Sequence, residues 1–242
     1  MKVYSDWAEW RQRKEQYVCG LLGGLPVPEV LEVLPGGVSV LSLLDGVPLS
    51  SVESVDEYEV YRQMGALLAR IHAVAQPAFG YVVTEVLEPE ATNLAYMSRQ
   101  FAAKLADFLR YGGDPGLHAL MEGYVERHRD LFAACSQAVL CHNDFHEGNI
   151  LVTDGRVTGV VDMENAVAGD PVLDLAKVDY YAVRGSAAKF AGLLAGYGEF
   201  ARDRLAIYKL YHALELWDWF ASIGRTAPLP GIAADIRSFV DG

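Results

Sequence analysis

The segment that decides the fold is Leu140–Val152, which reads LCHNDFHEGNILV and holds polar residues between two apolar runs. Short apolar runs of this kind favour β-strands, so the polar residues are expected in the loop between them. There Asp144 could accept a proton from a hydroxyl group, and the amide oxygen of Asn149, five residues later, could bind a hard cation. The pattern H-x-D-x-x-x-x-N has few fixed positions, and chance alone produces it on the order of once in a hundred chains of this length. It therefore needs support from a second segment.

That support comes from Val160–Asp162, which places another carboxylate at the end of a β-type run, 13 residues after Asn149. The stretch Thr153–Arg156 has the composition of a turn, so Asn149 and Asp162 are expected at the two ends of one hairpin. Mg²⁺ binds oxygen ligands and is commonly held by a small number of protein groups together with substrate phosphates. The two segments together indicate phosphoryl transfer, in which a protein mainly positions the acceptor hydroxyl, offsets charge and excludes water.

Three segments of the chain, His142–Asn149, Val161–Glu164 and Gly169–Ala176, resemble the aminoglycoside phosphotransferase family. The resemblance implies an α+β fold similar to that of protein kinases. Such a fold has two lobes, and here we expect a truncated N-terminal lobe followed by a mainly helical C-terminal lobe. The resemblance also implies ATP or GTP as the phosphoryl donor and Mg²⁺ as the metal ion.

The same resemblance implies roles for five side chains near the middle of the chain. Asp144 would be the catalytic carboxylate that faces the acceptor hydroxyl. Asn149 and Asp162 would be the magnesium ligands. His142 and Asp170 would support the catalytic loop.

In the N-terminal lobe the resemblance makes Lys2 the strand lysine that contacts the nucleotide phosphates, and Glu15 its partner on the following helix. The linker between the lobes would be the segment 42–46. Its residues Leu43 and Leu44 would hold the edge of the adenine ring through their backbone groups.

The chain departs from the family pattern at its N-terminus. Kinase-like proteins place a phosphate-covering loop and two strands ahead of the lysine strand, whereas this sequence begins at Met1 and Lys2 and holds neither G-x-G-x-x-G nor G-x-x-x-x-G-K-[ST]. We therefore expect a reduced N-terminal lobe with its hinge over 1–46 and a C-terminal catalytic and substrate-binding lobe over 47–242. Whether the short N-terminus is native or a truncation, and whether this chain is active, are left open.

The composition excludes several classes of protein. With 20 Lys and Arg against 32 Asp and Glu, the formal charge is −12, which opposes binding to nucleic acid and attracts small cations. The 3 cysteines have no C-x-x-C spacing, so neither a disulfide framework nor a zinc site is expected. The sequence contains no run of about 18 apolar residues, so no membrane span is expected. We expect a cytoplasmic protein without a membrane or nucleic-acid partner, and the oligomeric state is unknown.

Periodicity and turn residues predict the remaining elements. A helix is expected over 6–22 with Asp6 as its N-cap, and a polar, irregular stretch over 76–89. The other expected elements are strands at 30–34, 38–44, 139–141, 150–152 and 157–161, helices at 56–75, 92–111 and 115–135, and helices beyond residue 171 with breaks near Gly185, Gly198 and Gly224.

The acceptor site is expected in the C-terminal helical region, where Glu215 and Asp218 flank Trp217 and could bind amino groups of a sugar or cyclitol. The favoured function is transfer of the γ-phosphoryl group of ATP or GTP to a hydroxyl of a small amine-bearing molecule, such as an aminoglycoside-like antibiotic. One alternative is a housekeeping kinase for choline, homoserine or a sugar. Another is a catalytically silent binding protein with a kinase-like fold.

Overall fold

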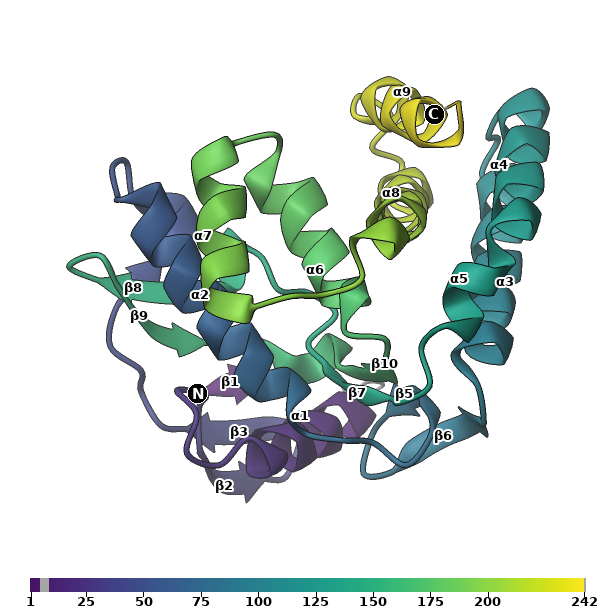
Figure 1. The fold of residues 1–242 in the computed structure, drawn as a ribbon. Coiled ribbons are helices and arrows are strands. Elements are labelled where there is room, and N and C mark those ends of the chain that lie inside the picture. The colour runs from purple at the N-terminus through teal and green to yellow at the C-terminus, as the bar shows by residue number, and fades with distance from the viewer. Residues whose placement is uncertain (5–8, 242) are drawn as a thin grey trace. The chain divides into compact units, whose positions relative to one another are not determined.

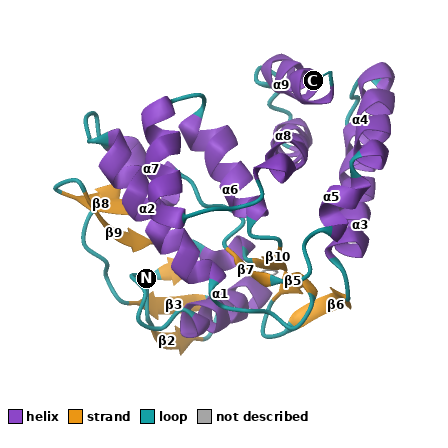
Figure 2. Cartoon of the chain, in the orientation of Figure 1, coloured by secondary structure: helices purple, strands orange, loops and turns teal. Residues whose placement is uncertain are grey.

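The structure is a computed structural model that describes residues 1–4 and 9–241 (Figure 1). The chain forms two compact units, Met1–Pro89 with Gln137–Phe200, and Glu90–Ser136 with Ala201–Gly242. The chain contains both helices and antiparallel strands, with more helix than strand (Figure 2), which confirms the expected α+β class. The lobe boundary predicted at residue 46 stays a prediction.

The first unit begins with a small antiparallel sheet covered by a helix. Its strands are β1 (Lys2–Val3), β2 (Val30–Leu34) and β3 (Val38–Leu41), in the order β1-β3-β2, and its helix is α1 (Glu9–Leu21). The predicted hairpin turn is confirmed, since Gly36 and Gly37 have φ of 78° and 71°. Helix α1 is fixed on the sheet because Gln12 Nε2 donates to the Val38 carbonyl at 2.9 Å. The predicted N-cap Asp6 lies outside the described residues.

A second sheet carries the predicted hairpin. Strands β8 (Ile150–Thr153) and β9 (Arg156–Val160) are antiparallel, with Ile150 opposite Val160. Asp154 and Gly155 both have positive φ, which suits the tight turn of a twisted hairpin. The hairpin is joined by a third strand, because β4 (Val47–Pro48) pairs with the outer side of β8. The sheet thus joins the chain after the linker to the hairpin.

A third sheet was not predicted in full. It has the order β6-β5-β10-β7 and consists of β5 (Phe79–Val82), β6 (Val86–Glu90), β7 (Val139–Cys141) and β10 (Val167–Gly169). The prediction of an irregular stretch over 76–89 is therefore wrong. The strands that were missed are three to five residues long, and β5 and β10 are joined through pairs such as Val167 with Tyr81. Partners so distant in sequence leave no local pattern to read.

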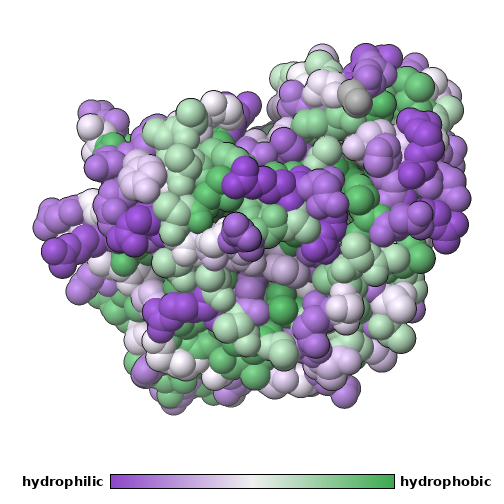
Figure 3. All heavy atoms as spheres, viewed as in Figure 1, coloured by the Kyte–Doolittle hydropathy of each residue, from purple (hydrophilic) through white to green (hydrophobic). Residues whose placement is uncertain are grey.

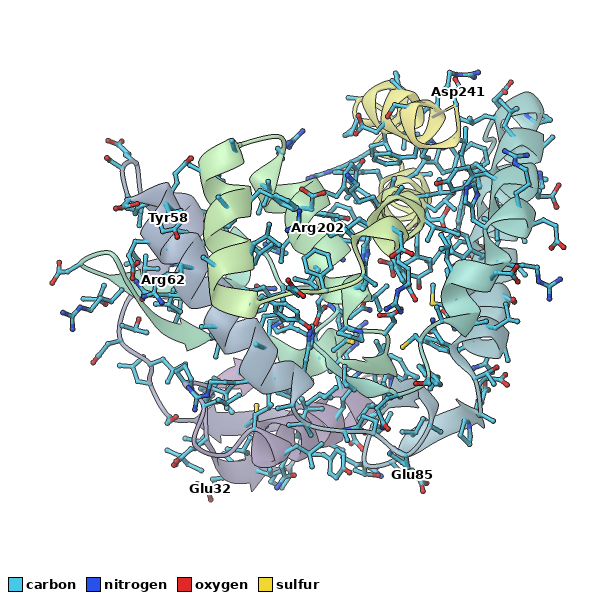
Figure 4. All side chains as sticks on the ribbon, in the orientation of Figure 1. Glu32, Tyr58, Arg62, Glu85, Arg202 and Asp241 are labelled. Carbon is cyan, nitrogen blue, oxygen red and sulfur yellow. The ribbon has the colours of Figure 1, made fainter. Side chains whose placement is uncertain are left out.

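Two long helices of the first unit lie side by side (Figure 1). Helix α2 (Glu57–His72) packs along α7 (Ala187–Tyr197). The contact depends on glycines, because a Cβ on Gly196 would collide with the Arg62 carbonyl and one on Gly192 with that of Tyr58. One face of α2 is apolar, and its residues Tyr61, Met64, Leu67, Leu68 and Ile71 are buried. Tyr58, in the first turn, is 44% exposed (Figure 4).

The first unit is completed by shorter helical segments. They are the 3-10 helices at Leu49–Ser51, Glu147–Asn149 and Met163–Asn165, α6 (Val172–Val178), and a π-helical turn at Asp179–Val183. The helix predicted after residue 171 is thus interrupted before the break expected at Gly185.

The second unit is helical and has its own aromatic core. Its elements are α3 (Asn93–Arg110), α4 (Pro115–Arg127), α5 (Arg129–Ala133), the 3-10 helix Arg202–Arg204, α8 (Leu205–Ser222) and α9 (Leu229–Val240). The helix predicted over 115–135 is broken at His128, which ends α4 and begins α5. Pro115 lies in the first turn of α4, as predicted. Asn93 Nδ2 donates to both the Phe132 carbonyl and the Tyr208 hydroxyl, which ties α3 to α5 and α8.

The surface mixes hydrophilic and hydrophobic residues on the face drawn in Figure 3. Among the described residues, no helix combines the length and the apolar character needed to cross a membrane.

Candidate active site

The predicted catalytic loop follows β7 and turns back on itself through Asp144 and Asn149. The Asn149 Nδ2 group donates to the Asp144 backbone carbonyl at 2.9 Å and to Asp144 Oδ2 at 3.2 Å. Asn165 Nδ2 reaches the same Oδ2 at 3.5 Å. The predicted catalytic carboxylate is therefore fixed at one of its two oxygens by amide groups.

The backbone of the loop is held by Asp174, which lies on α6. Its Oδ2 accepts from the His142 amide at 2.7 Å and its Oδ1 from the Asn143 amide at 2.6 Å. Asn143 has φ of 61°, which is an unusual conformation for a residue other than glycine, directly before Asp144. The two charge-assisted hydrogen bonds to Asp174 offset the energetic cost of this conformation. They also fix the backbone from which the Asp144 side chain projects.

Asp174 is itself oriented by His72, which in turn is held by Tyr197. His72 Nε2 lies 3.0 Å from Asp174 Oδ2, and His72 Nδ1 lies 2.8 Å from the Tyr197 hydroxyl. Burial alone would raise the pKa of Asp174, but the hydrogen bonds from His72 and from the loop amide, and the nearby histidines, lower it below its usual value. Asp174 is thus a buried carboxylate that stays ionised and can hold two backbone N–H groups.

His142 connects the loop to the strand end that precedes Asp162. Its Nδ1 accepts from the Asp144 amide at 3.2 Å, so Nε2 carries the proton and donates to the Val161 carbonyl at 3.0 Å. Complete burial lowers the pKa of His142, which agrees with a neutral ring. This geometry suits the supporting role that the resemblance implies.

The other oxygen of Asp144 lies near two side-chain nitrogen atoms. Lys177 Nζ lies 3.4 Å and His146 Nε2 3.6 Å from Asp144 Oδ1. Burial would raise the pKa of Asp144, but the hydrogen bond from His146 and the charge of Lys177 hold it well below its usual range. The carboxylate is therefore ionised and able to accept a hydrogen bond from an alcohol.

The predicted second carboxylate is part of a chain of ion pairs. Lys2 Nζ lies 2.8 Å from Asp162 Oδ1, 3.1 Å from Glu15 Oε1 and 3.4 Å from Glu164 Oε2. Burial by itself would lower the pKa of Lys2, but the hydrogen bond to Asp162 and the neighbouring carboxylates raise it. Lys2 thus contacts both Glu15 and Asp162, the two carboxylates that the resemblance assigns from separate segments of the sequence.

The donor set fits a hard cation such as Mg²⁺. The Val161 amide donates to the Asn149 carbonyl at 3.0 Å, which brings residue 149 next to the segment that carries Asp162. Because Asn149 Nδ2 makes the hydrogen bonds to Asp144, its Oδ1 is the atom left for a cation, and the Asp162 side chain is 38% exposed. One amide oxygen and one carboxylate are the ligand types that Mg²⁺ accepts.

A second group of ligand-type atoms lies behind the loop. His72, Cys141 and Asp174 are buried and offer ligand atoms within 4.8 Å of one another. His72 and Asp174 are already bonded to each other, and Asp174 also accepts the two loop amides. This group therefore serves the loop rather than an ion.

The remaining predicted residues of the first unit have less defined surroundings. The Leu43 side chain is 92% exposed, and Leu44 packs against Gly159 of β9. Asp170 Oδ1 accepts from the Val172 amide at 2.9 Å at the start of α6, and its carbonyl accepts from the Cys141 thiol at 3.4 Å. The nucleotide-binding role of Leu43 and Leu44 and the loop-supporting role of Asp170 stay predictions.

Glu215 and Asp218 belong to the second unit, on α8. Glu215 Oε2 lies 2.8 Å from His212 Nδ1. Asp218 is buried, and Lys104 Nζ lies 3.5 Å from its Oδ2. Burial raises the pKa of Asp218 to about 7, against the opposing charge of Lys104. Their role in binding an acceptor stays a prediction.

Several residues that contact Asp144 or hold its loop have no role predicted from the sequence. They are His72, Asn165, Asp174, Lys177 and Tyr197. The available signal was the segment Gly169–Ala176, which is part of the resemblance and contains Asp174. The sequence could not place His72 and Tyr197 behind the loop, because each lies far from it along the chain.

Comparison with known proteins supports the family that the sequence resembles. The family model described as "Phosphotransferase enzyme family" matches residues 8–208. Among solved structures, the chain is similar to a thermostable mutant of aminoglycoside phosphotransferase APH(4)-Ia, with a TM-score of 0.76, 20% identity, and coverage of 96% of this chain and 83% of that one.

Two other solved structures are similar over comparable lengths. One is the macrolide 2'-phosphotransferase MphH from Brachybacterium faecium, with a TM-score of 0.67, 20% identity, and coverage of 95% of this chain and 80% of that one. The other is a putative fructosamine-3-kinase from Thermobifida fusca, with a TM-score of 0.71, 21% identity, and coverage of 96% and 80%. These similarities confirm the expected protein-kinase-like fold, and with the family match they show that the chain belongs to the phosphotransferase enzyme family.

Proposed function

We propose that this phosphotransferase moves the γ-phosphoryl group of a nucleoside triphosphate, ATP or GTP, to a hydroxyl group of a small amine-bearing molecule. The observation that carries the proposal is the placement of Asp144. Its carboxylate is ionised, held by Asn149 at one oxygen, and presented by a loop whose amides are fixed by Asp174. Such a preorganised carboxylate suits a reaction in which positioning supplies most of the rate.

In the proposed reaction a bond forms between the acceptor oxygen and the γ-phosphorus, and the bond from that phosphorus to the leaving diphosphate oxygen breaks. Asp144 orients the hydroxyl and takes up its proton, which is later released to water. Lys2, held by Glu15, contacts the phosphates of the donor. Mg²⁺ held by Asn149 and Asp162 would offset charge on the phosphate oxygens when bound.

A nucleotide donor is further supported by a similar solved structure. The APH(4)-Ia mutant has also been solved in a ternary complex with ADP and hygromycin B, and that structure matches this chain with a TM-score of 0.75. An amine-bearing acceptor is favoured by the formal charge of −12, which attracts small cations.

A housekeeping sugar kinase remains the second candidate. It is favoured by the similarity to the putative fructosamine-3-kinase, whose TM-score of 0.71 lies between those of the aminoglycoside and macrolide phosphotransferases named above. Both candidates use the same catalytic residues and differ in the acceptor.

The proposal is tested by incubating the chain with Mg²⁺ and radiolabelled ATP or GTP and a panel of aminoglycosides, amino sugars, choline and homoserine. We expect one class of alcohol to be phosphorylated, and Asp144→Asn to lower turnover by about 10³-fold or more while nucleotide affinity stays within about threefold. Equal losses of binding and turnover in Asp144→Asn would contradict the assigned role. A wild-type chain that binds nucleotide but phosphorylates nothing would favour the silent binding protein.

A further inference from the structure

Lys177 is a buried lysine on α6 that has no role in the reaction described above. Its side chain is 8% exposed, and all seven residues of α6 are buried. The Nζ atom lies 3.4 Å from Asp144 Oδ1 and 4.9 Å from the centroid of the Tyr181 ring. A buried ammonium group needs compensating interactions, and both of these are of that kind.

His146 approaches the same carboxylate oxygen from the catalytic loop. Its ring is stacked on Tyr181 with centroids 6.3 Å apart and an interplanar angle of 18°. Its Nδ1 accepts from the Gly148 amide at 3.0 Å, so Nε2, 3.6 Å from Asp144 Oδ1, carries a proton. Tyr181 thus supports two nitrogen donors that meet at one oxygen.

The two oxygens of Asp144 therefore differ in their surroundings. Oδ2 is contacted by the neutral amide groups of Asn149 and Asn165, whereas Oδ1 is contacted by Lys177 and His146. An acceptor hydroxyl held by Asp144 would lie within a few ångströms of the Lys177 ammonium group, because that group is already in contact with the carboxylate. The incoming phosphoryl group must approach the same hydroxyl oxygen.

We propose that Lys177 is a further catalytic residue, whose ammonium group donates a hydrogen bond to a phosphoryl oxygen while the group passes to the hydroxyl at Asp144. This inference rests on the proposed function. The bond from the hydroxyl oxygen to the γ-phosphorus forms, the bond to the leaving diphosphate oxygen breaks with its electron pair left on that oxygen, and the hydroxyl proton goes to Asp144. Lys177 keeps its proton throughout and offsets the charge on the transferring group.

A purely structural role predicts a different result. Replacing one partner of a buried ion pair mainly lowers stability, and it would affect folding rather than the chemical step. Lys189 provides a matched control in the same unit. Its Nζ lies 2.9 Å from Glu147 Oε1 of the catalytic loop and 5.2 Å from the Tyr61 ring centroid, so it has a similar carboxylate and aromatic environment but a different loop residue.

The test measures Mg²⁺-dependent hydrolysis of ATP or GTP by phosphate release, in which water replaces the acceptor, for wild type, Lys177→Met, Lys177→Arg and Lys189→Met. Thermal unfolding is recorded for each variant. We expect Lys177→Met to lower kcat by about 100-fold or more with the nucleotide KM within about threefold, and Lys177→Arg to recover at least about tenfold of that loss. Lys189→Met is expected to lower kcat by less than about fivefold.

Other outcomes overturn the inference in distinguishable ways. If Lys177→Met keeps kcat within about fivefold of an active wild type, or if its loss equals that of Lys189→Met, Lys177 is structural and the proposed function stands. If Lys177→Met lowers kcat and nucleotide affinity together, the catalytic role is equally refuted. If the wild type transfers phosphate neither to water nor to any alcohol in the panel, the proposed function fails and this inference fails with it.

Discussion

At the scale of single residues, the candidate site depends on how Asp174 holds the catalytic loop. It is a buried carboxylate that accepts hydrogen bonds from two backbone amides. One of these belongs to Asn143, which has a left-handed conformation. Replacing it by asparagine keeps the size but removes the charge and turns one acceptor into a donor. The loop amides would then lose charge-assisted hydrogen bonds, which contribute more than neutral ones.

We therefore predict that Asp174→Asn lowers the free energy of unfolding by about 2–4 kcal/mol and lowers turnover by at least tenfold. The pH dependence has a defined sign. Because the pKa of Asp174 in the folded chain lies below the ordinary value of 3.8, its contribution is fully present above that value and is lost as the pH falls further. Denaturant unfolding of wild type and variant between pH 3 and pH 7 checks this. A constant difference across that range would contradict it.

The sequence predicted some residues of the site but not their supports. Asp144, Asn149 and Asp162 follow from spacing and from the types of ligand that phosphoryl transfer needs. Lys177 could not be predicted in the same way, because its contact with Asp144 depends on how α6 packs behind the loop. From sequence alone, a lysine in an apolar helix segment is equally compatible with a solvent-exposed and a buried side chain.

At the scale of elements, the packing of α2 against α7 depends on glycine. We predict that Gly196→Ala lowers the free energy of unfolding by about 1–3 kcal/mol, because the added methyl group would collide with the Arg62 carbonyl on α2. Gly20 on α1 provides the control, since no atom lies within 4 Å of the position of its added Cβ. Gly20→Ala should leave stability unchanged or raise it by up to about 1 kcal/mol. Equal effects of the two changes on urea unfolding would refute the close helix contact.

Helix α8 of the second unit carries a carboxyl group whose burial has a measurable cost. The pKa of Asp218 is raised to about 7, so the cost of burying its charge grows as the pH rises from its ordinary value of 3.8 toward 7. We predict that Asp218→Asn raises the free energy of unfolding by about 1–2 kcal/mol at pH 8 and has little effect at pH 4. Asp107→Asn, which removes a neighbouring like charge, should give a smaller gain in the same direction. A gain at pH 4 equal to that at pH 8 would contradict the prediction.

The elements differ in how well the sequence predicted them, and the reason is the range of their interactions. The helix predicted over 56–75 appears as Glu57–His72, because the Asp56 N-cap and the apolar period are local signals. Strands β5 and β10 were missed because each is short and is stabilised by pairing with the other, and paired residues such as Tyr81 and Val167 lie 86 positions apart in the chain. Local patterns do not encode such pairs.

At the scale of the whole molecule, the net charge bears on which ligands the protein can bind. The formal charge of −12 opposes a nucleic-acid partner and favours a cationic acceptor, while the phosphates of the donor need local cations to approach the site. In the proposed function Lys2 is one such cation, and it pairs with Glu15 and Asp162. The central claim is that this cluster, with Asn149, forms a site for a nucleotide and Mg²⁺.

The measurement that tests this claim most directly is calorimetric titration of the chain with ATP and with GTP, in the presence and absence of Mg²⁺. Asp162→Asn is the matched variant, because it keeps the size of the side chain and removes the proposed metal ligand charge. We predict Mg²⁺-dependent binding by the wild type that falls at least tenfold in Asp162→Asn. Binding that does not depend on Mg²⁺, or an equal affinity in the variant, would contradict the metal assignment, and no nucleotide binding by the wild type would contradict the account as a whole.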